Sequence, residues 1–181
     1  MGVPVDALAP AAARAAGPAL AALLWDAVDS GASLGFLPPL LPATAATYWH
    51  GVFADLEAGS RVLLAARDGA GTIVGSAQLE LAMRENGRHR AEVAKVMVLR
   101  TARRQGVGRA LMLAAEDQAR RLGRSTLILD TRAGDPSERL YVSVGWQRVG
   151  EIPRFARSAG GALHPTAFYY KLLLTTDGGT S

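Results

Sequence analysis

Residues 96–112 constrain the fold of this chain more than any other segment, because an apolar strand there passes through a short basic turn into an amphipathic helix. Gly106 and Gly108 in the turn lack the side chains that would block close approach to the backbone. The first N–H groups of a helix have no partner within it, and the helix dipole makes their surroundings positive. Arg103, Arg104 and Arg109 add positive charge. The segment therefore predicts a loop that binds phosphate or pyrophosphate.

Two common nucleotide-binding motifs are excluded by the residues around these glycines. A Walker A loop requires Gly-Lys followed by Ser or Thr, and no such tripeptide follows them. A dinucleotide-binding fingerprint requires a third glycine at the position where this chain has Leu111. An ordinary strand-to-helix turn with exposed arginines is the structural alternative that stays open.

The pattern Arg-x-x-Gly-x-Gly over 103–108 resembles the acyl-coenzyme A loop of the GNAT superfamily of N-acetyltransferases. Further along the chain, Leu140-Tyr141 followed by Gly145-Trp146 resembles the family's Leu-Tyr-x-x-x-Gly-Phe ending, at the family's spacing from the loop. Gly134 is a departure, because many members have Asn there and its side-chain contact to the cofactor is not available here. The resemblance implies an N-acetyltransferase fold with acetyl-CoA as co-substrate.

Shorter segments are similar to the tabtoxin-resistance type of acetyltransferase within that superfamily. They are residues 30–36, 77–79, 86–87, 90–93, 95–98, 129–131 and 163–167. The resemblance extends over most of the chain, from about residue 20 to about residue 172. It implies the fold and the cofactor more strongly than the acceptor, because relatives with one fold act on different amines.

Composition limits the classes of chemistry available. The chain has 181 residues, 49% of them hydrophobic, which predicts one domain with a full core. It has no cysteine, which excludes a cysteine acyl-enzyme and favours direct transfer in a ternary complex. Its three histidines are widely spaced, so no metal site is expected. Neither a signal peptide nor a membrane span is recognisable, so a cytoplasmic location is expected.

The charge balance is basic, with a net charge of +4 and a pI of about 10.0. The arginines gather around the glycine turn and the helix that follows it, which suits a triphosphorylated cofactor. No aromatic platform of the RNA-binding kind is present, so no nucleic-acid partner is expected. Whether the chain is a monomer or a homodimer stays open.

The order of apolar segments and turn residues predicts an α/β fold with a mixed sheet, helices on both faces and a single domain. The resemblance implies that this sheet is GNAT-like and mostly antiparallel. Residues 1–16 are expected to be loosely ordered, 17–174 to form the domain, and 175–181 to be a flexible tail. The expected helices are 18–28, 44–57 with Thr44 as the cap, 106–121 and 135–144. The expected strands are 61–67, 72–83, 89–99, 125–130, 146–151 and 167–173. Residues 152–165 are expected to be a long functional loop.

The resemblance also implies a cofactor site. The strand before the glycine turn would hold the pantetheine arm through its backbone, and one N–H there would polarise the thioester carbonyl. The expected strand residues are Val96, Met97 and Val98. The other expected cofactor-binding residues are Arg103, Arg104, Gln105, Gly106, Val107, Gly108, Arg109, Gly134 and Ser137.

Three residues are candidates for catalysis. Glu92 is the first choice for the general base, expected on the same strand face as Val96 and about 13 Å from it, so that water would relay the proton. Asp130 is the second choice, at the end of a buried strand. The resemblance places Tyr141 as the general acid, with an ordinary phenol pKa near 10. The structural alternatives are a surface carboxylate, a turn carboxylate and a packing tyrosine. If both carboxylates face one cleft, the pKa of at least one should be raised.

Loop residues outside the scaffold are candidates for binding the acceptor. They are Ser33 and Phe36 in the proline-rich loop, and His164. The expected acceptor is the amine of a small molecule, such as a toxin or an antibiotic. Two other functions stay open: a non-catalytic acyl-CoA-binding sensor, and an acetyltransferase for lysine in proteins or peptides.

Overall fold

The computed structural model describes residues 2–173, which form one seven-stranded sheet in the order β1-β2-β3-β4-β5-β7-β6. Strands β4 and β5 are parallel, and every other neighbouring pair is antiparallel. The strands are β1 (Val5–Ala7), β2 (Arg61–Arg67), β3 (Ile73–Leu81), β4 (Arg90–Val98), β5 (Thr126–Arg132), β6 (Gln147–Arg157) and β7 (Leu163–Leu172). The predicted mixed, mostly antiparallel sheet is confirmed.

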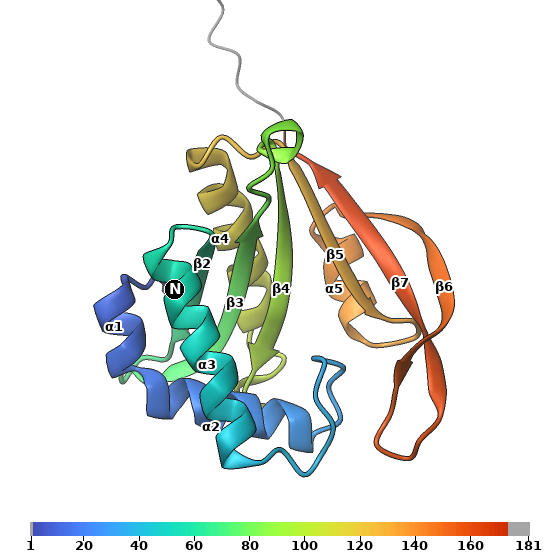
Figure 1. Ribbon diagram of the computed structural model, residues 1–181, viewed down its shortest axis with the longest axis horizontal. Helices are drawn as coiled ribbons and strands as arrows, with labels where there is room; N and C mark the ends of the chain where they lie inside the picture. Colours follow the sequence, from blue (N-terminus) through green and yellow to red (C-terminus); the bar gives the residue numbers. More distant parts are fainter. Residues whose placement is uncertain (1, 174–181) are drawn as a thin grey trace, which may run out of the picture.

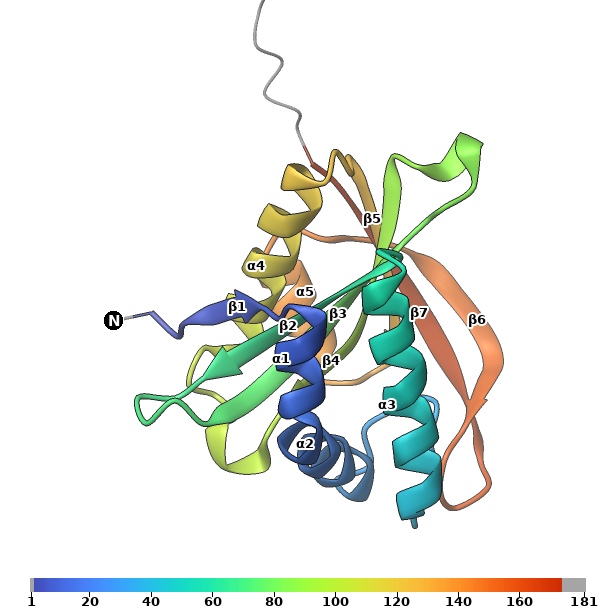
Figure 2. The same ribbon diagram turned by 60° about the vertical axis from the view of Figure 1, so that its left-hand side comes forward.

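Helices cover both faces of the sheet, as predicted (Figures 1 and 2). The helices are α1 (Pro10–Ala15), α2 (Gly17–Asp29), α3 (Pro42–Glu57), α4 (Val107–Arg121) and α5 (Ser137–Ser143). Leu63, Ala65 and Met97 pack with α2 and α3 on one face. Leu64 and Leu79 pack with α4 on the other, because alternate residues of a strand point to opposite faces. No helix of the described chain is long and apolar enough to cross a membrane.

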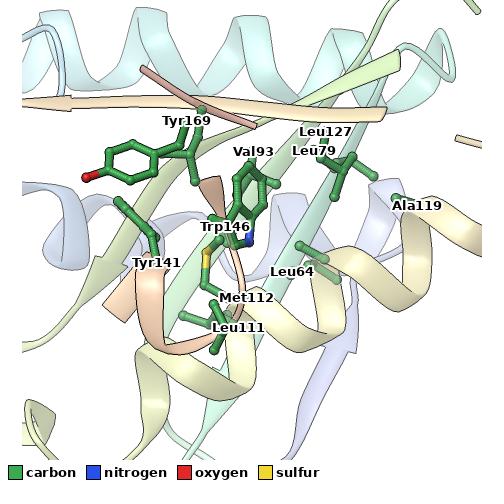
Figure 3. Close-up of a cluster of buried hydrophobic side chains, with 14 of the residues drawn as sticks. Leu64, Leu79, Val93, Leu111, Met112, Ala119, Leu127, Tyr141, Trp146 and Tyr169 are labelled. Carbon is green, nitrogen blue, oxygen red and sulfur yellow. The ribbon is translucent and has the colours of Figure 1, made fainter. Parts of the chain in front are cut away.

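The core under α4 and α5 includes an aromatic group (Figure 3). The ring centroid of Tyr141 lies 6.5 Å from that of Trp146 and 5.9 Å from that of Tyr169. Beside them the buried Glu116 accepts hydrogen bonds from Trp146 Nε1 at 3.1 Å and from Lys171 Nζ at 2.7 and 2.8 Å. This pairing satisfies a carboxylate that would otherwise be costly to bury, and it joins α4 to β7.

Strand β4 contains a bulge at its centre. Ser76 and Gln78 of β3 pair with Met97 and Ala94 of β4, so β4 has one extra residue between these pairs. Lys95 lies in this bulge and has a φ of +51°, a conformation that is uncommon for residues other than glycine. The bulge reverses which face of the sheet each following β4 side chain occupies.

Strands β4 and β5 part soon after they meet. Their parallel pairing covers three residue pairs and ends at Glu92 opposite Ile128. Strand β4 continues to Val98 and β5 to Arg132, and Figure 1 shows the two strands adjacent at one end and separated at the other. The far edge of β5 is fully paired with β7. The edge of β4 after Glu92 therefore faces a gap in the sheet, with backbone groups that no ladder satisfies.

Several expected boundaries are corrected by the structure. The segment 1–16 is not loose where it is described: β1 pairs with β2, and Ala13 of α1 is fully buried. The expected long loop over 152–165 is instead a β-hairpin of β6 and β7, closed by hydrogen bonds between Ser158 and Ala162. Helix α3 begins at Pro42 rather than at a Thr44 cap, since proline suits the first helical turn. The expected tail over 175–181 lies outside the described residues.

Replacing Gly75 by Ala should destabilise the fold. A Cβ on Gly75 would lie 2.8 Å from Val107 Cγ1 and 2.9 Å from the Met97 carbonyl oxygen, so α4 or β4 would have to move. We expect a loss of about 1–3 kcal/mol in the free energy of unfolding, measured by urea denaturation. Gly69→Ala is the matched control, because its Cβ would meet no atom within 4 Å. Equal stabilities of the two variants would contradict the close approach of α4 to the sheet.

Candidate active site

The N-terminus of α4 presents a row of free backbone donors. Gly106 caps the helix with a φ of +83°, and Arg104 also has a positive φ, of +63°. The Ala110 N–H donates to the Gly106 carbonyl at 3.0 Å. Between residues 104 and 109, no backbone N–H has a hydrogen-bond partner within the part of the chain that the structure describes. This geometry suits an anion with several oxygen acceptors.

The arginines of this loop have different surroundings. Arg103 donates to Ser30 Oγ at 2.7 Å and to the Val98 carbonyl at 3.3 Å, so it joins the loop to the end of α2. Arg109 donates to the Ser143 carbonyl of α5 at 3.3 Å. Arg104 is exposed and makes no hydrogen bond to any residue of the described range. Arg100, which sequence reasoning did not select, donates to Asp26 of α2 at 2.7 Å.

The two glycines of the motif serve different purposes. A side chain on Gly106 would meet no atom within 4 Å, so glycine is favoured there by its positive φ. A Cβ on Gly108 would lie 3.0 Å from Leu140 Cδ2, so its absence lets α4 approach α5. Gly108 therefore has a packing role in addition to the open phosphate approach expected from the sequence.

The bulge at Lys95 overturns one expectation about β4. Glu92 was expected to share a face with Val96 and Val98, which regular alternation requires. Val96 and Val98 instead pack on the α4 side, while Met97 packs with α2 and α3. The extra residue in β4 causes this reversal, so Glu92 shares its face with Met97.

Glu92 and Asp130 lie on the same face of neighbouring strands. Glu92 pairs with Ile128, and Asp130 follows Ile128 by two residues. Burial raises the pKa of Glu92, and the negative charges of Glu80 and Asp130 raise it further, while Lys95 lowers it. Asp130 keeps one side open to solvent, yet the protein around it raises its pKa too, again opposed by Lys95. Glu92 and Asp130 therefore share one face of the sheet, and the Lys95 ammonium lowers the pKa of both.

A polar network next to Glu92 was not anticipated. Glu80 of β3 is directly opposite Glu92 in the strand register, and Arg61 of β2 donates to Glu80 Oε1 at 2.7 Å. Arg61 also donates to Gln78, whose amide donates to Tyr48 Oη at 2.7 Å. The pairing of β2, β3 and β4 brings Arg61, Gln78, Glu80 and Glu92 together, and α3 adds Tyr48. No local sequence pattern predicts this network.

Tyr141 of α5 is buried against Trp146 and Tyr169, with 6% of its surface exposed. Burial raises the pKa of Tyr141 to about 12, and the Ser137 side chain opposes this rise. Ser137 Oγ in turn lies 2.9 Å from Thr131 Oγ1 of β5. The Gly134 N–H donates to Glu138 Oε1 at 2.6 Å, which holds the turn before α5. At neutral pH the Tyr141 phenol is therefore protonated and able to donate.

A cavity of about 400 Å³ lies between the α2–α3 loop and the β6–β7 hairpin. The predicted acceptor residues Ser33 and Phe36 line it, together with Arg132 of β5 and Phe155 of β6. His164 is on β7 opposite Ala156 and is not among the lining residues. No cluster of three or more potential metal ligands occurs within residues 2–173.

Glu92→Gln should stabilise the protein at neutral pH. A carboxyl whose pKa is raised by folding favours the folded state when protonated, so its effect on stability worsens as pH rises from the unfolded pKa through the folded one. Removing this charge opposite Glu80 should add a few tenths to about 1 kcal/mol to the free energy of unfolding. Thermal denaturation should show the gain at pH 7.5, and the gain should shrink towards pH 4.3, about the ordinary pKa of glutamate.

Glu85→Gln, at an exposed position, is the control for that measurement. A stabilisation independent of pH, or equal in the control, would contradict the electrostatic cause.

Residues 25–146, more than half of the chain, match the Acetyltransferase (GNAT) family. An "uncharacterized N-acetyltransferase in hisH-hisA intergenic region" of Azospirillum brasilense is 37% identical over 109 residues, which cover 59% of this chain and 62% of that relative. The chain thus matches less than two thirds of that relative's length.

Solved structures agree with the fold. The ribosomal-protein-alanine N-acetyltransferase of Brucella melitensis has a TM-score of 0.79 at 25% identity, covering 94% of this chain and 100% of its own. A phosphinothricin acetyltransferase of Sinorhizobium meliloti, solved in complex with acetyl-CoA, has a TM-score of 0.77 at 20% identity, covering 98% and 95%. The family match and the predicted loop and tyrosine motifs lead to one conclusion: the chain belongs to the GNAT family of acetyltransferases.

Proposed function

We propose that this chain transfers an acetyl group from acetyl-CoA directly to the amine nitrogen of a small molecule. Acetyl-CoA is the co-substrate of the reaction. One observation carries the proposal: the edge of β4 is unpaired from the carboxylates with raised pKa values, where β4 and β5 part, to its end at Val98, beside the free donors of α4.

The residues present fit acetyl-CoA. The pyrophosphate would accept hydrogen bonds from the free N–H groups of 104–109, with Arg104 as an additional cation. The pantetheine arm would pair with the backbone of Val96, Met97 and Val98, which have no partner strand on that side. A backbone N–H of β4 would then donate to the thioester carbonyl, and such a preorganised donor can be worth about 3 kcal/mol in the transition state.

The transfer needs an uncharged amine and a protonated leaving group. Glu92 and Asp130 would take a proton from the incoming ammonium, through water where the distance requires it. The amine nitrogen then attacks the carbonyl carbon, a C–N bond forms, and the C–S bond breaks. Tyr141 would give its phenolic proton to the departing thiolate, and the acylated nitrogen would lose its second proton, which restores the phenol, as the amide forms. The raised pKa values suit a general base, because a carboxylate accepts a proton more readily near neutral pH when its pKa is closer to that pH.

The size of the cavity supports a small acceptor. A volume of about 400 Å³ is within the usual range for small-molecule sites, roughly 300–1,000 Å³. The similarity of several segments to the tabtoxin-resistance type favours a toxin or antibiotic amine. The relatives differ in what their names state, since one acts on a ribosomal protein and the other on phosphinothricin. A protein acceptor is therefore the second candidate.

The direct test is thiol release from acetyl-CoA in the presence of small amines and, separately, a lysine peptide. We expect turnover with a small amine and intersecting initial-rate lines, as a ternary complex requires. Ping-pong kinetics or an isolable acyl-enzyme would exclude direct transfer. Tight acetyl-CoA binding without turnover on any amine would instead favour a sensor, and preference for the peptide would refute the small acceptor.

Tyr141→Phe should separate catalysis from binding. Loss of the phenolic proton should lower kcat by about 100-fold, while the Kd for acetyl-CoA, measured by calorimetry, stays nearly constant. Tyr170→Phe is the control, because Tyr170 Oη bonds Gln147 at the β6–β7 edge of the sheet. An unchanged kcat in Tyr141→Phe with chemistry rate-limiting would assign Tyr141 to packing alone.

A further inference from the structure

Arg132 is a partly buried cation whose charge has no partner. It ends β5 and pairs with Thr166 of β7 through the backbone. Its Nε is buried and makes no hydrogen bond, and its guanidinium forms no ion pair with any described residue. Burying a guanidinium nitrogen costs free energy unless a ligand, an ion or a water molecule supplies the missing partner.

The cavity that Arg132 lines is cationic and otherwise mostly apolar. Its only other charged lining residue is Arg157, which is exposed and donates to the Gly161 carbonyl at 3.1 Å. No carboxylate is among the residues that line the cavity. Phe36 and Phe155 contribute aromatic surface, which weakens the competition from bulk water for a charge held there.

The neighbouring carboxylates Asp130 and Glu92 are stabilised by another cation and not by Arg132. Asp130 is two residues before Arg132 on the same face of β5. Yet Lys95, not Arg132, is the cation that lowers the pKa of Asp130. Lys95 also lowers the pKa of Glu92. The positive charge of Arg132 therefore remains available to a ligand in the cavity.

We propose that Arg132 determines acceptor specificity by binding an acidic group, a carboxylate or another small oxyanion, of the amine substrate. The inference rests on the proposed function and adds the substrate class to it. A strand advances about 3.3 Å per residue, so the Cα atoms of Asp130 and Arg132 are about 6.6 Å apart. An amine held near Asp130 and an acid held by Arg132 then belong to one small molecule of the amino-acid kind. Arginine suits this role because its guanidinium can form two parallel hydrogen bonds with a carboxylate.

The test compares matched acids and amides on the intact protein. The probes are glycine, L-alanine, L-methionine and L-lysine, each with its carboxamide. Binding is measured by calorimetry with CoA in place of acetyl-CoA, so that no turnover occurs, and kcat/KM is measured separately by thiol release. We expect the wild-type chain to prefer at least one acid over its amide by about 10- to 100-fold in both measurements.

Arg132→Gln should abolish that preference by weakening the binding of the acid, while binding of the amide stays the same. Arg132→Lys should restore part of the preference. The Kd for CoA should stay within about twofold in both variants. Arg121→Gln on the outer side of α4, where Arg121 pairs with Asp117, is the matched control and should retain the wild-type preference.

Three results would overturn the inference. The first is a wild-type chain that binds no acid better than its amide. The second is a preference that survives in Arg132→Gln. The third is a large rise in the Kd for CoA in that variant, which would place the arginine in the cofactor site. Failure of the proposed function is a separate result, because acid-selective binding with CoA can be observed even where no amine is acetylated.

Discussion

The parting of β4 from β5 is the constraint on which the rest of the structure depends. A parallel pair normally continues along both strands, but here the ladder stops at Glu92 and Ile128. The backbone groups of β4 beyond this point cannot be satisfied within the sheet. They are tolerable at the surface of a slot that a ligand with its own amide groups can enter. Glu92 of β4 and Asp130 of β5 lie on the two strands that border this gap.

The bulge at Lys95 decides which helices the β4 side chains after it pack against. Without the bulge, regular alternation would point Met97 towards α4 and the valines beside it towards α2. Each of these side chains would then lie in the opposite hydrophobic cluster. With it, β4 is held on one side by α2 and α3 and on the other by α4. The close contact of Gly75 with Val107 and Met97 keeps α4 tight against the sheet, so the free N–H groups at its start are held in a fixed place.

The charged groups of Glu92 and Arg132 lower the stability of the folded protein. Glu80 and Glu92 are paired directly opposite each other on the adjacent strands β3 and β4, and burial raises the pKa of Glu92. Arg61 and Lys95 offset this repulsion only in part. The raised pKa of Glu92 and the buried Nε of Arg132, which has no hydrogen-bond partner among the described residues, are both unfavourable to the folded state. Such a cost in stability is expected if the proposed site binds charged groups.

The sequence predicted what depends on local pattern and failed where pairing between distant strands decides. The glycine turn, the helix after it and the tyrosine motif are local, and the predicted α4 begins within a residue of its place. The face of Glu92 was wrong because a bulge shifts register without a sequence signal that alternation can reveal. The ion pairs of Arg100 and Arg61 depend on residues far away in the chain, so no local spacing could show them. Arg132 was missed for the same reason, although it stands two residues after a selected acid.

Residue-resolved amide hydrogen exchange, with and without acetyl-CoA, tests the central claim most directly. If β4 and the start of α4 hold the co-substrate, the N–H groups of the β4 edge after Glu92 and of residues 104–109 should exchange markedly more slowly in the complex. The N–H groups of β1, at the far edge of the sheet, should be unaffected. Protection of the loop alone, with unchanged exchange along β4, would contradict the assignment of the gap between β4 and β5 as the acyl-binding slot.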